Sequence, residues 1–394
     1  MKKSISIVGG GPSALMTAAF LDSSKFDVTL YEKNKSVGRK FLVAGDGGFN
    51  ITHSESIEEM IERFTPIEFL KEALTEFSNE DLRTWLEELG IPTFEGSSHR
   101  VYPEEGIKPI EVLNAILKKL DANGTTIKTE HTWTGWNKDA LVFNDSTNVK
   151  SDYTIFALGG GSWKVTGSDG SWSNLFEEKN IEMLPFTPAN CAYKVDWTKG
   201  FLGRNAGKPL KNISMSCFGN EQKGEAVITE FGLEGNAIYA LSPQIQELLE
   251  KKGEATVLID LKPTLTMEVL LEKMYKARVP KTTDILRKYV KLGPSKLDLL
   301  KLNTTREEFM DINSVAKKVK ALPVTLTAAA SLDEAISTTG GIALTELNEN
   351  YELSKLPNNF CIGEMSDWNA PTGGYLLQAC FSMGSKIGHH LNSK

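Results

Sequence analysis

Residues 4–14, Ser-Ile-Ser-Ile-Val-Gly-Gly-Gly-Pro-Ser-Ala, decide the fold of this chain. The apolar residues of 4–8 predict a short strand. Three glycines then lead into a predicted helix over 12–21, and Pro12 stands in its first turn, where the fixed φ and missing N–H of proline are tolerated. A strand, a glycine turn and a helix in direct succession predict the first half of a βαβ unit.

Within this stretch, Gly9, Gly11 and Ala14 match the Gly-x-Gly-x-x-Gly/Ala fingerprint of dinucleotide-binding proteins. The first position permits a tight turn, the second lets the backbone approach a pyrophosphate, and the third keeps the helix close to the sheet. Free N–H groups and the dipole at the helix start favour bound phosphate. Glu32 ends a second predicted strand, 28–32, where an acid accepts hydrogen bonds from ribose hydroxyls. Dinucleotide binding is therefore predicted; the alternative is a purely structural glycine turn.

Further glycine-rich segments favour FAD over a nicotinamide cofactor alone. Gly38-Arg39-Lys40 follows the second strand closely and is followed by residues 45–50, Gly-Asp-Gly-Gly-Phe-Asn. We interpret these segments as backbone wrapping an extended cofactor, with one of the two cations near phosphate or isoalloxazine oxygens. The alternative is a mobile surface loop with solvated cations. A later predicted strand, 153–158, ends in Gly159-Gly160 and can return the chain to the same cofactor.

A last candidate segment lies near the carboxyl end. A predicted strand over 360–363 leads into Glu-Met-Ser-Asp-Trp, and residues 371–379, Pro-Thr-Gly-Gly-Tyr-Leu-Leu-Gln-Ala, open a predicted helix over 375–389. The start of that helix would face the pyrimidine edge of a flavin, where negative charge accumulates on reduction. The alternative is a glycine-rich capping turn.

These segments supply the residues expected to bind FAD. They are Gly9, Gly10, Gly11, Pro12, Ser13, Ala14, Glu32, Lys33, Arg39, Lys40, Gly45, Asp46, Gly47, Asn50, Ala157, Leu158, Gly159, Gly363, Glu364, Asp367, Gly373, Gly374, Tyr375 and Leu376. No catalytic triad, metal-ligand cluster or Walker loop is apparent, so no catalytic or metal-binding residue is assigned. His53 is a candidate proton donor near the flavin, and a capping or surface role is its alternative.

Taken together, these segments resemble the BaiN-like group of NAD(P)/FAD-dependent oxidoreductases, relatives of the glutathione-reductase-type flavoproteins. The resemblance runs nearly end to end, with further matches at 188–191, 320–323 and 334–337. Better-known members carry Arg and Cys where this chain has Gly48 and Phe49, so activity that depends on those two side chains does not carry over. The loop resembles that of a sister branch ending Gly-Gly-Leu-Asn-Leu-Thr-His-Ser-Glu.

The resemblance implies both an architecture and a chemistry. The architecture is an FAD domain interrupted by an inserted small β-barrel plus helices. The chemistry is reduction of activated C=C bonds or of a uracil ring in ribosomal RNA, or oxidation of a small aminoketone. NAD(P)H is a possible transient reductant, because no second glycine fingerprint followed by a strand and an acid marks a dedicated nicotinamide domain.

The order of predicted elements agrees with an α/β fold in which a Rossmann-like, glutathione-reductase-type FAD domain is interrupted by a smaller domain. We expect the FAD domain to comprise residues 1–189 and 326–394. The inserted domain would comprise 190–325, β-rich over 190–262 and helical over 263–325. Within it, the segment Ile-Thr-Glu-Phe-Gly-Leu-Glu-Gly, residues 228–235, is a candidate substrate lid, and a solvated β-turn is the alternative.

Composition places the protein among soluble globular chains, with 394 residues, 40% of them apolar and 24% charged. The four cysteines include no Cys-x-x-Cys pair, which excludes a disulfide framework and a zinc or dithiol motif. The first apolar run stops at Gly9, too short for a signal peptide. No run approaches the roughly 18 apolar residues of a membrane span. We expect a cytoplasmic protein.

The net charge of −7 is unevenly distributed, since residues 190–325 carry 22 Lys and Arg against 16 Asp and Glu, whereas the other residues carry 22 against 35. The basic excess lies mainly in 263–322 and suggests either a solvated helical face or an anionic partner. Three functions stay open: a reductase or oxidase of a small molecule, an RNA-modifying flavoenzyme, and a flavin-binding protein without turnover. The oligomeric state and the substrate are not predicted.

Overall fold

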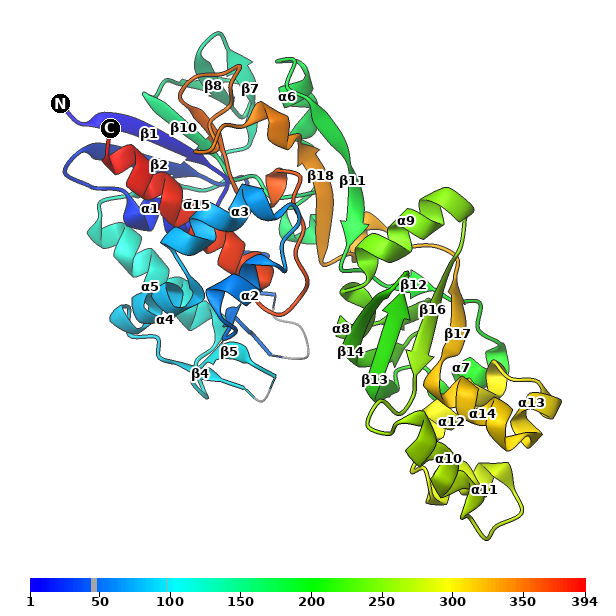
Figure 1. The fold of residues 1–394 in the computed structure, drawn as a ribbon. Coiled ribbons are helices and arrows are strands. Elements are labelled where there is room, and N and C mark those ends of the chain that lie inside the picture. The colour runs from blue at the N-terminus through cyan, green and yellow to red at the C-terminus, as the bar shows by residue number, and fades with distance from the viewer. Residues whose placement is uncertain (44–47, 97) are drawn as a thin grey trace. The chain divides into compact units, whose positions relative to one another are not determined.

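The computed structural model describes every residue except 44–47 and 97. The chain forms two compact units, the first comprising Met1–Pro188 and Ile336–Lys394 and the second Ala189–Ala335 (Figure 1). The second boundary falls at 335 rather than at the expected 325. The reason is that residues after 325 remain hydrogen-bonded to the second unit, where Ala330 N–H donates to Ala192 O at 2.8 Å.

A five-stranded parallel sheet forms the centre of the first unit, in the order β19-β10-β1-β2-β6. Its strands are β1 (Lys3–Val8), β2 (Phe26–Tyr31), β6 (Thr126–Lys128), β10 (Tyr153–Phe156) and β19 (Asn359–Cys361). Strand β1 lies in the middle, with Ile5 paired to Val28 on one side and to Tyr153 on the other. The carboxyl ends of parallel strands share one edge, where ligands bind in sheets of this type.

Helices α1 (Pro12–Phe20) and α15 (Tyr375–Asn392) pack closely against each other (Figure 1), and glycines of α15 lie at the contact. A Cβ atom at Gly384 would lie 2.6 Å from Ser13 O, and one at Gly388 would lie 2.6 Å from the Cβ of Phe20. The two glycines, four residues apart, therefore form a seam along α15 that lets the helices approach closely. The other helices of this unit are α2 (Ile57–Ile61), α3 (Ile67–Glu76), α4 (Asn79–Glu88), α5 (Pro109–Ala122) and α6 (Ser173–Glu177).

Three smaller sheets complete the first unit. A three-stranded meander comprises β7 (Trp133–Asn137), β8 (Ala140–Phe143) and β9 (Thr147–Val149). A second sheet comprises β3 (Thr52–His53), β5 (Arg100–Pro103) and β4 (Thr93–Glu95). The pair β11 (Met183–Ala189) and β18 (Ser337–Ile342) lies where the chain leaves this unit and returns to it. Short 3-10 turns are η1 (Lys164–Thr166), η3 (Leu344–Glu346) and η4 (Gly363–Met365).

The second unit is an antiparallel sheet in the order β12-β15-β14-β13-β16-β17. Its strands are β12 (Tyr193–Lys194), β13 (Pro209–Cys217), β14 (Asn220–Ile228), β15 (Gly232–Glu234), β16 (Ala255–Asp260) and β17 (Leu322–Leu326). Residues just beyond β17 return to β12, because Lys194 N–H donates to Ala328 O at 2.8 Å and Thr327 N–H donates to Lys194 O at 3.0 Å. These bonds join the two edges of the sheet, as in a small barrel.

The helical part of the second unit follows the expected pattern over 263–325, with α10 (Met267–Tyr275), α11 (Thr282–Lys288), α12 (Pro294–Leu302), α13 (Arg306–Met310) and α14 (Ile312–Lys320). The segment 190–262, expected to be β-rich, also contains helices that were not predicted: α7 (Lys199–Asn205), α8 (Asn236–Tyr239) and α9 (Ser242–Lys252). Helix α9 had a readable signal, with proline in its first turn and Gly253 in the left-handed region at its end. The turn η2 (Leu332–Glu334) ends this unit.

Over the described residues, every helix is either too short or too polar to cross a bilayer.

Candidate functional site

The glycine turn after β1 contains two glycines with different requirements. Gly9 has φ +107°, and a Cβ atom there would lie 2.2 Å from Ala157 O, so only glycine fits. Gly11 is the N-cap of α1 with an ordinary φ of −83°, and a Cβ atom there would meet nothing within 4 Å. Among the described residues, no side chain caps this helix end, and Pro12 occupies its first turn. The front of α1 therefore presents backbone to open space.

Glu32 directly follows β2 and is 9% exposed. One carboxylate oxygen, Oε2, accepts a hydrogen bond from Gly10 N–H at 2.9 Å, and the other, Oε1, accepts from Asn34 N–H at 2.8 Å and from its side-chain amide at 2.6 Å. These bonds hold the carboxylate beside the glycine turn. Since a carboxylate offers about four lone-pair sites, it can still accept from a ligand hydroxyl.

An open cleft adjoins this turn. Its volume of about 840 Å³ includes space at the mouth that is open to solvent. The expected cofactor residues that line it are Gly9, Gly10, Gly11, Glu32, Lys33, Arg39, Ala157, Leu158 and Gly159. Sequence reasoning missed further lining residues, including His131, Trp133, Ser168, Trp172 and Leu175. The meander reaches the cleft because His131 N–H donates to Glu32 O at 2.9 Å, a contact with no signature in the sequence.

Two of the expected cations hold a segment of chain along the cleft. Lys33 Nζ pairs with Asp169 Oδ2 at 2.8 Å, and Arg39 Nη2 donates to Val165 O at 2.9 Å. Burial opposes the charge on Asp169, but the hydrogen bonds from Lys33 and Ser171 hold the pKa of this carboxyl below its ordinary value. Both cations thus fasten residues 165–169 next to the glycine turn.

Lys40, Glu364 and Asp367 lie outside the cleft lining and join segments distant in sequence. Lys40 Nζ donates to Ser162 Oγ at 2.8 Å and to Glu364 Oε2 at 2.9 Å. The other oxygen of Glu364 accepts from Thr338 N–H at 3.0 Å, and Asp367 Oδ1 accepts from Gly340 N–H at 2.7 Å. The two acids therefore satisfy backbone donors of β18, which positions the segment leading into α15.

The start of α15 projects beyond the start of α1. Gly363, which begins η4 twelve residues before Tyr375, adjoins the first turn of α1, since a Cβ there would lie 2.7 Å from Ser13 Oγ. The contacts of Gly384 with Ser13 and of Gly388 with Phe20 show that the two helices run in the same direction. Gly388 lies 13 residues after Tyr375, whereas Phe20 lies eight residues after Pro12, so α15 begins about 8 Å beyond the start of α1. An extended ligand held at Gly11 can reach this end.

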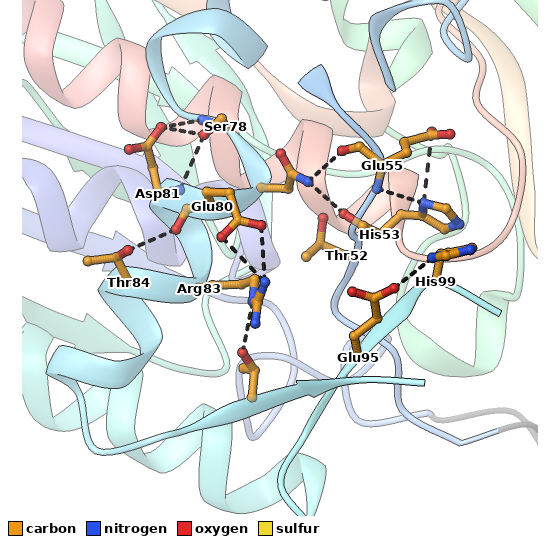
Figure 2. Close-up of polar contacts among 12 residues, drawn as sticks. Thr52, His53, Glu55, Ser78, Glu80, Asp81, Arg83, Thr84, Glu95 and His99 are labelled. Carbon is orange, nitrogen blue, oxygen red and sulfur yellow. Dashed lines mark hydrogen bonds and ion pairs between the residues drawn. The ribbon is translucent and has the colours of Figure 1, made fainter. Parts of the chain in front are cut away.

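Glycines also shape the α15 end itself. Gly374 is the N-cap with φ +101°, and a Cβ atom there would lie 2.5 Å from the Cα of Thr52. Gly373 has φ +121° and adjoins the side chain of Arg100. Tyr375, the first residue of the helix, is buried and stacks on the ring of His53 with centroids 5.2 Å apart. Figure 2 shows the polar contacts around His53 on β3.

The remaining residues expected to bind the cofactor lie partly in α1 and α15 and partly outside the described residues. Pro12, Ser13 and Ala14 form the first turn of α1, and Ser13 and Ala14 are buried. Leu376 is partly buried against the main core of the first unit. Gly45, Asp46 and Gly47 lie outside the described residues.

One buried polar atom of the cleft lining supports the fit of an organic ligand. Trp133 Nε1 is covered and has no hydrogen-bond partner among the described residues. The expected cofactor residue Asn50 also has an unpartnered buried amide, Nδ2, but Asn50 does not line the cleft. Buried donors in native proteins are nearly always paired. With the open front of α1 and the Glu32 carboxylate, the Trp133 donor fits a dinucleotide such as FAD.

A family model described as the HI0933-like protein Rossmann domain matches residues 3–390. The chain belongs to the HI0933-like family. This agrees with the resemblance to BaiN-like oxidoreductases noted in the sequence.

Curated relatives of this HI0933-like chain align over nearly their whole length. A 3-dehydro-bile acid delta(4,6)-reductase of Clostridium scindens is 24% identical over 412 residues, covering 98% of each chain. A ribosomal RNA dihydrouridine synthase of Haemophilus influenzae is 24% identical over 393 residues, covering 95% of each. The synthase of the same name from Escherichia coli is 22% identical, covering 95% of this chain and 94% of its own.

Solved structures share the fold at low identity. A flavocytochrome c3 fumarate reductase in an open conformation superposes with a TM-score of 0.52 and 15% identity, covering 100% of this chain and 78% of its own. A 3-ketosteroid delta1-dehydrogenase of Sterolibacterium denitrificans gives 0.50 and 11% identity, with both chains fully covered. The expected α/β Rossmann-type fold is confirmed, as is the general assignment to the FAD-dependent oxidoreductases.

Proposed function

We propose that this HI0933-like protein binds FAD along the cleft and uses it to reduce a small organic substrate. The observation that carries the proposal is the uncapped front of α1 at Gly11, where a ligand can approach the backbone without meeting a side chain. Unpaired amides at a helix start, together with the helix dipole, favour a diphosphate. Glu32 would accept hydrogen bonds from the ribose of the adenosine half.

The chain's own residues set the position and electrostatics of the cofactor. Lys33 and Arg39 hold residues 165–169 beside the bound dinucleotide and add positive charge near its phosphates. The amides at the start of α15 would stabilise negative charge at the flavin end. When bound, the flavin supplies hydride transfer, the chemistry that the protein side chains lack.

We propose a C=C bond conjugated to a carbonyl group as the substrate class. The names of the curated relatives support this, since a 3-dehydro delta(4,6) steroid and a uracil ring both contain such a system. NADH or NADPH would bind transiently as reductant, because the sequence carries one glycine fingerprint with its strand and acid. We also propose a cytoplasmic location, which cell fractionation tests.

Reconstitution followed by rapid mixing tests these steps in order. The purified chain should take up FAD with a micromolar or lower dissociation constant and turn yellow. Anaerobic mixing with NADH and, separately, with NADPH should bleach the flavin absorbance near 450 nm with one of them. Failure to bind FAD would reject the proposal as a whole. Binding without bleaching at millimolar nucleotide would reject only the nicotinamide step.

An RNA-modifying enzyme is the second candidate. It is favoured by two relatives that are named ribosomal RNA dihydrouridine synthases and by the net positive charge of residues 190–325. Binding to ribosomal RNA should then weaken steeply with salt, because phosphate contacts release counterions. A weak affinity that does not change between 50 and 200 mM salt would remove this candidate. Comparison of RNA nucleosides and metabolites between a deletion strain and its parent distinguishes the two substrates.

A further inference from the structure

The position of His53 places a titratable side chain at the start of α15. Its neighbour Thr52 lies against Gly374, where an added Cβ would approach the Thr52 Cα to 2.5 Å. The ring of His53 stacks on Tyr375 with centroids 5.2 Å apart and planes at 21°. The imidazole therefore stands beside the helix end that projects beyond the front of α1.

The backbone around His53 is held by a buried amide. The side chain of Asn79 is 3% exposed, and its Nδ2 donates to His53 O at 2.8 Å and to Glu55 O at 3.0 Å. Asn79 is the first residue of α4, which begins with a capping box of Ser78 and Asp81 (Figure 2). The capped helix thus fixes the segment that carries the histidine.

The hydrogen bonds of His53 define its tautomer. Glu55 N–H donates to Nδ1 at 3.2 Å, so Nδ1 is the acceptor, and a neutral ring must carry its proton on Nε2. Nε2 has no hydrogen-bond partner among the described residues, and 15% of the side chain remains exposed. The imidazole therefore presents an unused N–H donor.

The groups facing His53 favour its neutral form. Burial is the main cause that lowers the pKa of His53, and Arg63, His99 and Arg100 lower it further, whereas Glu55 raises it. The carboxylate of Glu55 is itself paired with Arg63 at 2.9 Å. Although burial opposes its charge, hydrogen bonds from Arg63 and from the Tyr375 hydroxyl keep the pKa of Glu55 below its ordinary value. Glu95 faces the neighbouring His99 at 2.6 Å (Figure 2).

We propose that neutral His53 donates a hydrogen bond from Nε2 to the carbonyl oxygen of a conjugated substrate. The inference rests on the proposed function. When hydride adds to the β-carbon, the electron pair of the C=C bond moves toward the carbonyl, and negative charge develops on its oxygen. A fixed N–H donor stabilises that charge, as neutral imidazoles do in other enzymes. The α-carbon then takes a proton from solvent, and His53 keeps its own.

Long-range ¹⁵N–¹H spectra of the protein without FAD test the tautomer directly. We expect His53 to be neutral at pH 7.5 with its proton on Nε2. A proton on Nδ1, or a charged ring at this pH, would overturn the inference. His53→Gln and His99→Phe spectra assign the signals.

Binding of 4-nitrophenol to the FAD-loaded protein tests the donor. Its phenolate mimics the developing oxyanion and is followed by its absorbance. His53→Phe keeps a ring against Tyr375 but has no donor, and we expect at least tenfold weaker phenolate binding. His53→Gln places an amide N–H near the position of Nε2 and should retain most of the affinity. The control His99→Phe changes a side chain that is 71% exposed and should bind like the unaltered protein.

The outcomes separate this inference from the proposed function. The FAD affinity and melting temperature of each variant are measured first, which reveals any folding defect. If His53→Phe is misfolded, the test of the His53 donor depends on His53→Gln and on the tautomer. If FAD binds to all variants and phenolate binding is equal in His53→Phe, or absent in the unaltered protein, the role of His53 is wrong while FAD binding stands. If FAD does not bind at all, the proposed function itself fails.

Discussion

Gly9 and Gly11, two residues apart, respond differently to a methyl group. At Gly9 the positive φ and the 2.2 Å approach of Ala157 O make Gly9→Ala destabilising, by about 1–3 kcal/mol or more. At Gly11 the space is open and φ is ordinary, so Gly11→Ala should fold with a nearly unchanged melting temperature. We expect it to lose at least about tenfold in FAD affinity, because the methyl group occupies the path of the diphosphate. Calorimetry and flavin titration measure both effects; unchanged FAD affinity in Gly11→Ala would contradict the proposed phosphate site.

A second prediction at this scale concerns the unpaired indole N–H of Trp133. If this donor binds the cofactor, Trp133→Phe should lower FAD affinity roughly two- to tenfold, since a net hydrogen bond contributes about 0.5–1.5 kcal/mol. Trp136 is a matched control, because its ring lies 4.6 Å from that of Trp133 and does not line the cleft. Equal losses in Trp136→Phe would mean that packing, not the N–H, causes the effect.

At the level of helices and strands, the glycine seam between α1 and α15 sets the position of the start of α15 relative to the start of α1. A methyl group at Gly384 would lie 2.6 Å from Ser13 O and 3.0 Å from Thr17 N, both backbone atoms that cannot move aside. We expect Gly384→Ala to lower the free energy of unfolding by about 1–3 kcal/mol, the usual range for overpacking. Urea denaturation measures it.

The control for the seam is a helical glycine with free space around it. Gly203 lies within α7, and a Cβ atom there meets nothing within 4 Å. Gly203→Ala should therefore stabilise the chain slightly, by up to about 1 kcal/mol, through helix propensity alone. Loss of stability in both variants to the same extent would refute the steric explanation for Gly384.

For the whole molecule, two partly buried histidines predict how stability depends on pH. Burial is the main cause that holds the pKa values of His53 and His390 below the ordinary 6.5. At pH values between the folded and unfolded pKa, the unfolded chain binds more protons than the folded chain. The free energy of unfolding therefore falls as the pH drops below about 6.5. Below the folded pKa values, these histidines cause no further change. Urea denaturation at pH 7.5, 6.5 and 5.5 measures the slope. His53→Gln and His390→Gln should each reduce it, and an unchanged slope in the double variant would disprove the assignment.

The sequence by itself determined the features that depend on near neighbours along the chain. The strand, glycine turn and helix of 4–20 and the helical character of 263–325 are readable, because backbone conformation depends on residues a few positions apart. The position of Glu32 directly after β2, beside the glycine turn, was also readable, since a βαβ unit has a nearly constant length.

Only the tertiary structure decided which distant segments meet. It brought His131 and Trp133 into the cleft and paired Lys40 with Glu364 across 324 residues, contacts that depend on how sheets and helices pack and leave no periodic pattern in the chain. It also showed that Gly9 must be glycine for the fold, whereas a Cβ atom at Gly11 would meet no described residue within 4 Å. A fingerprint records that both are small, but the space around each one is created by other parts of the chain.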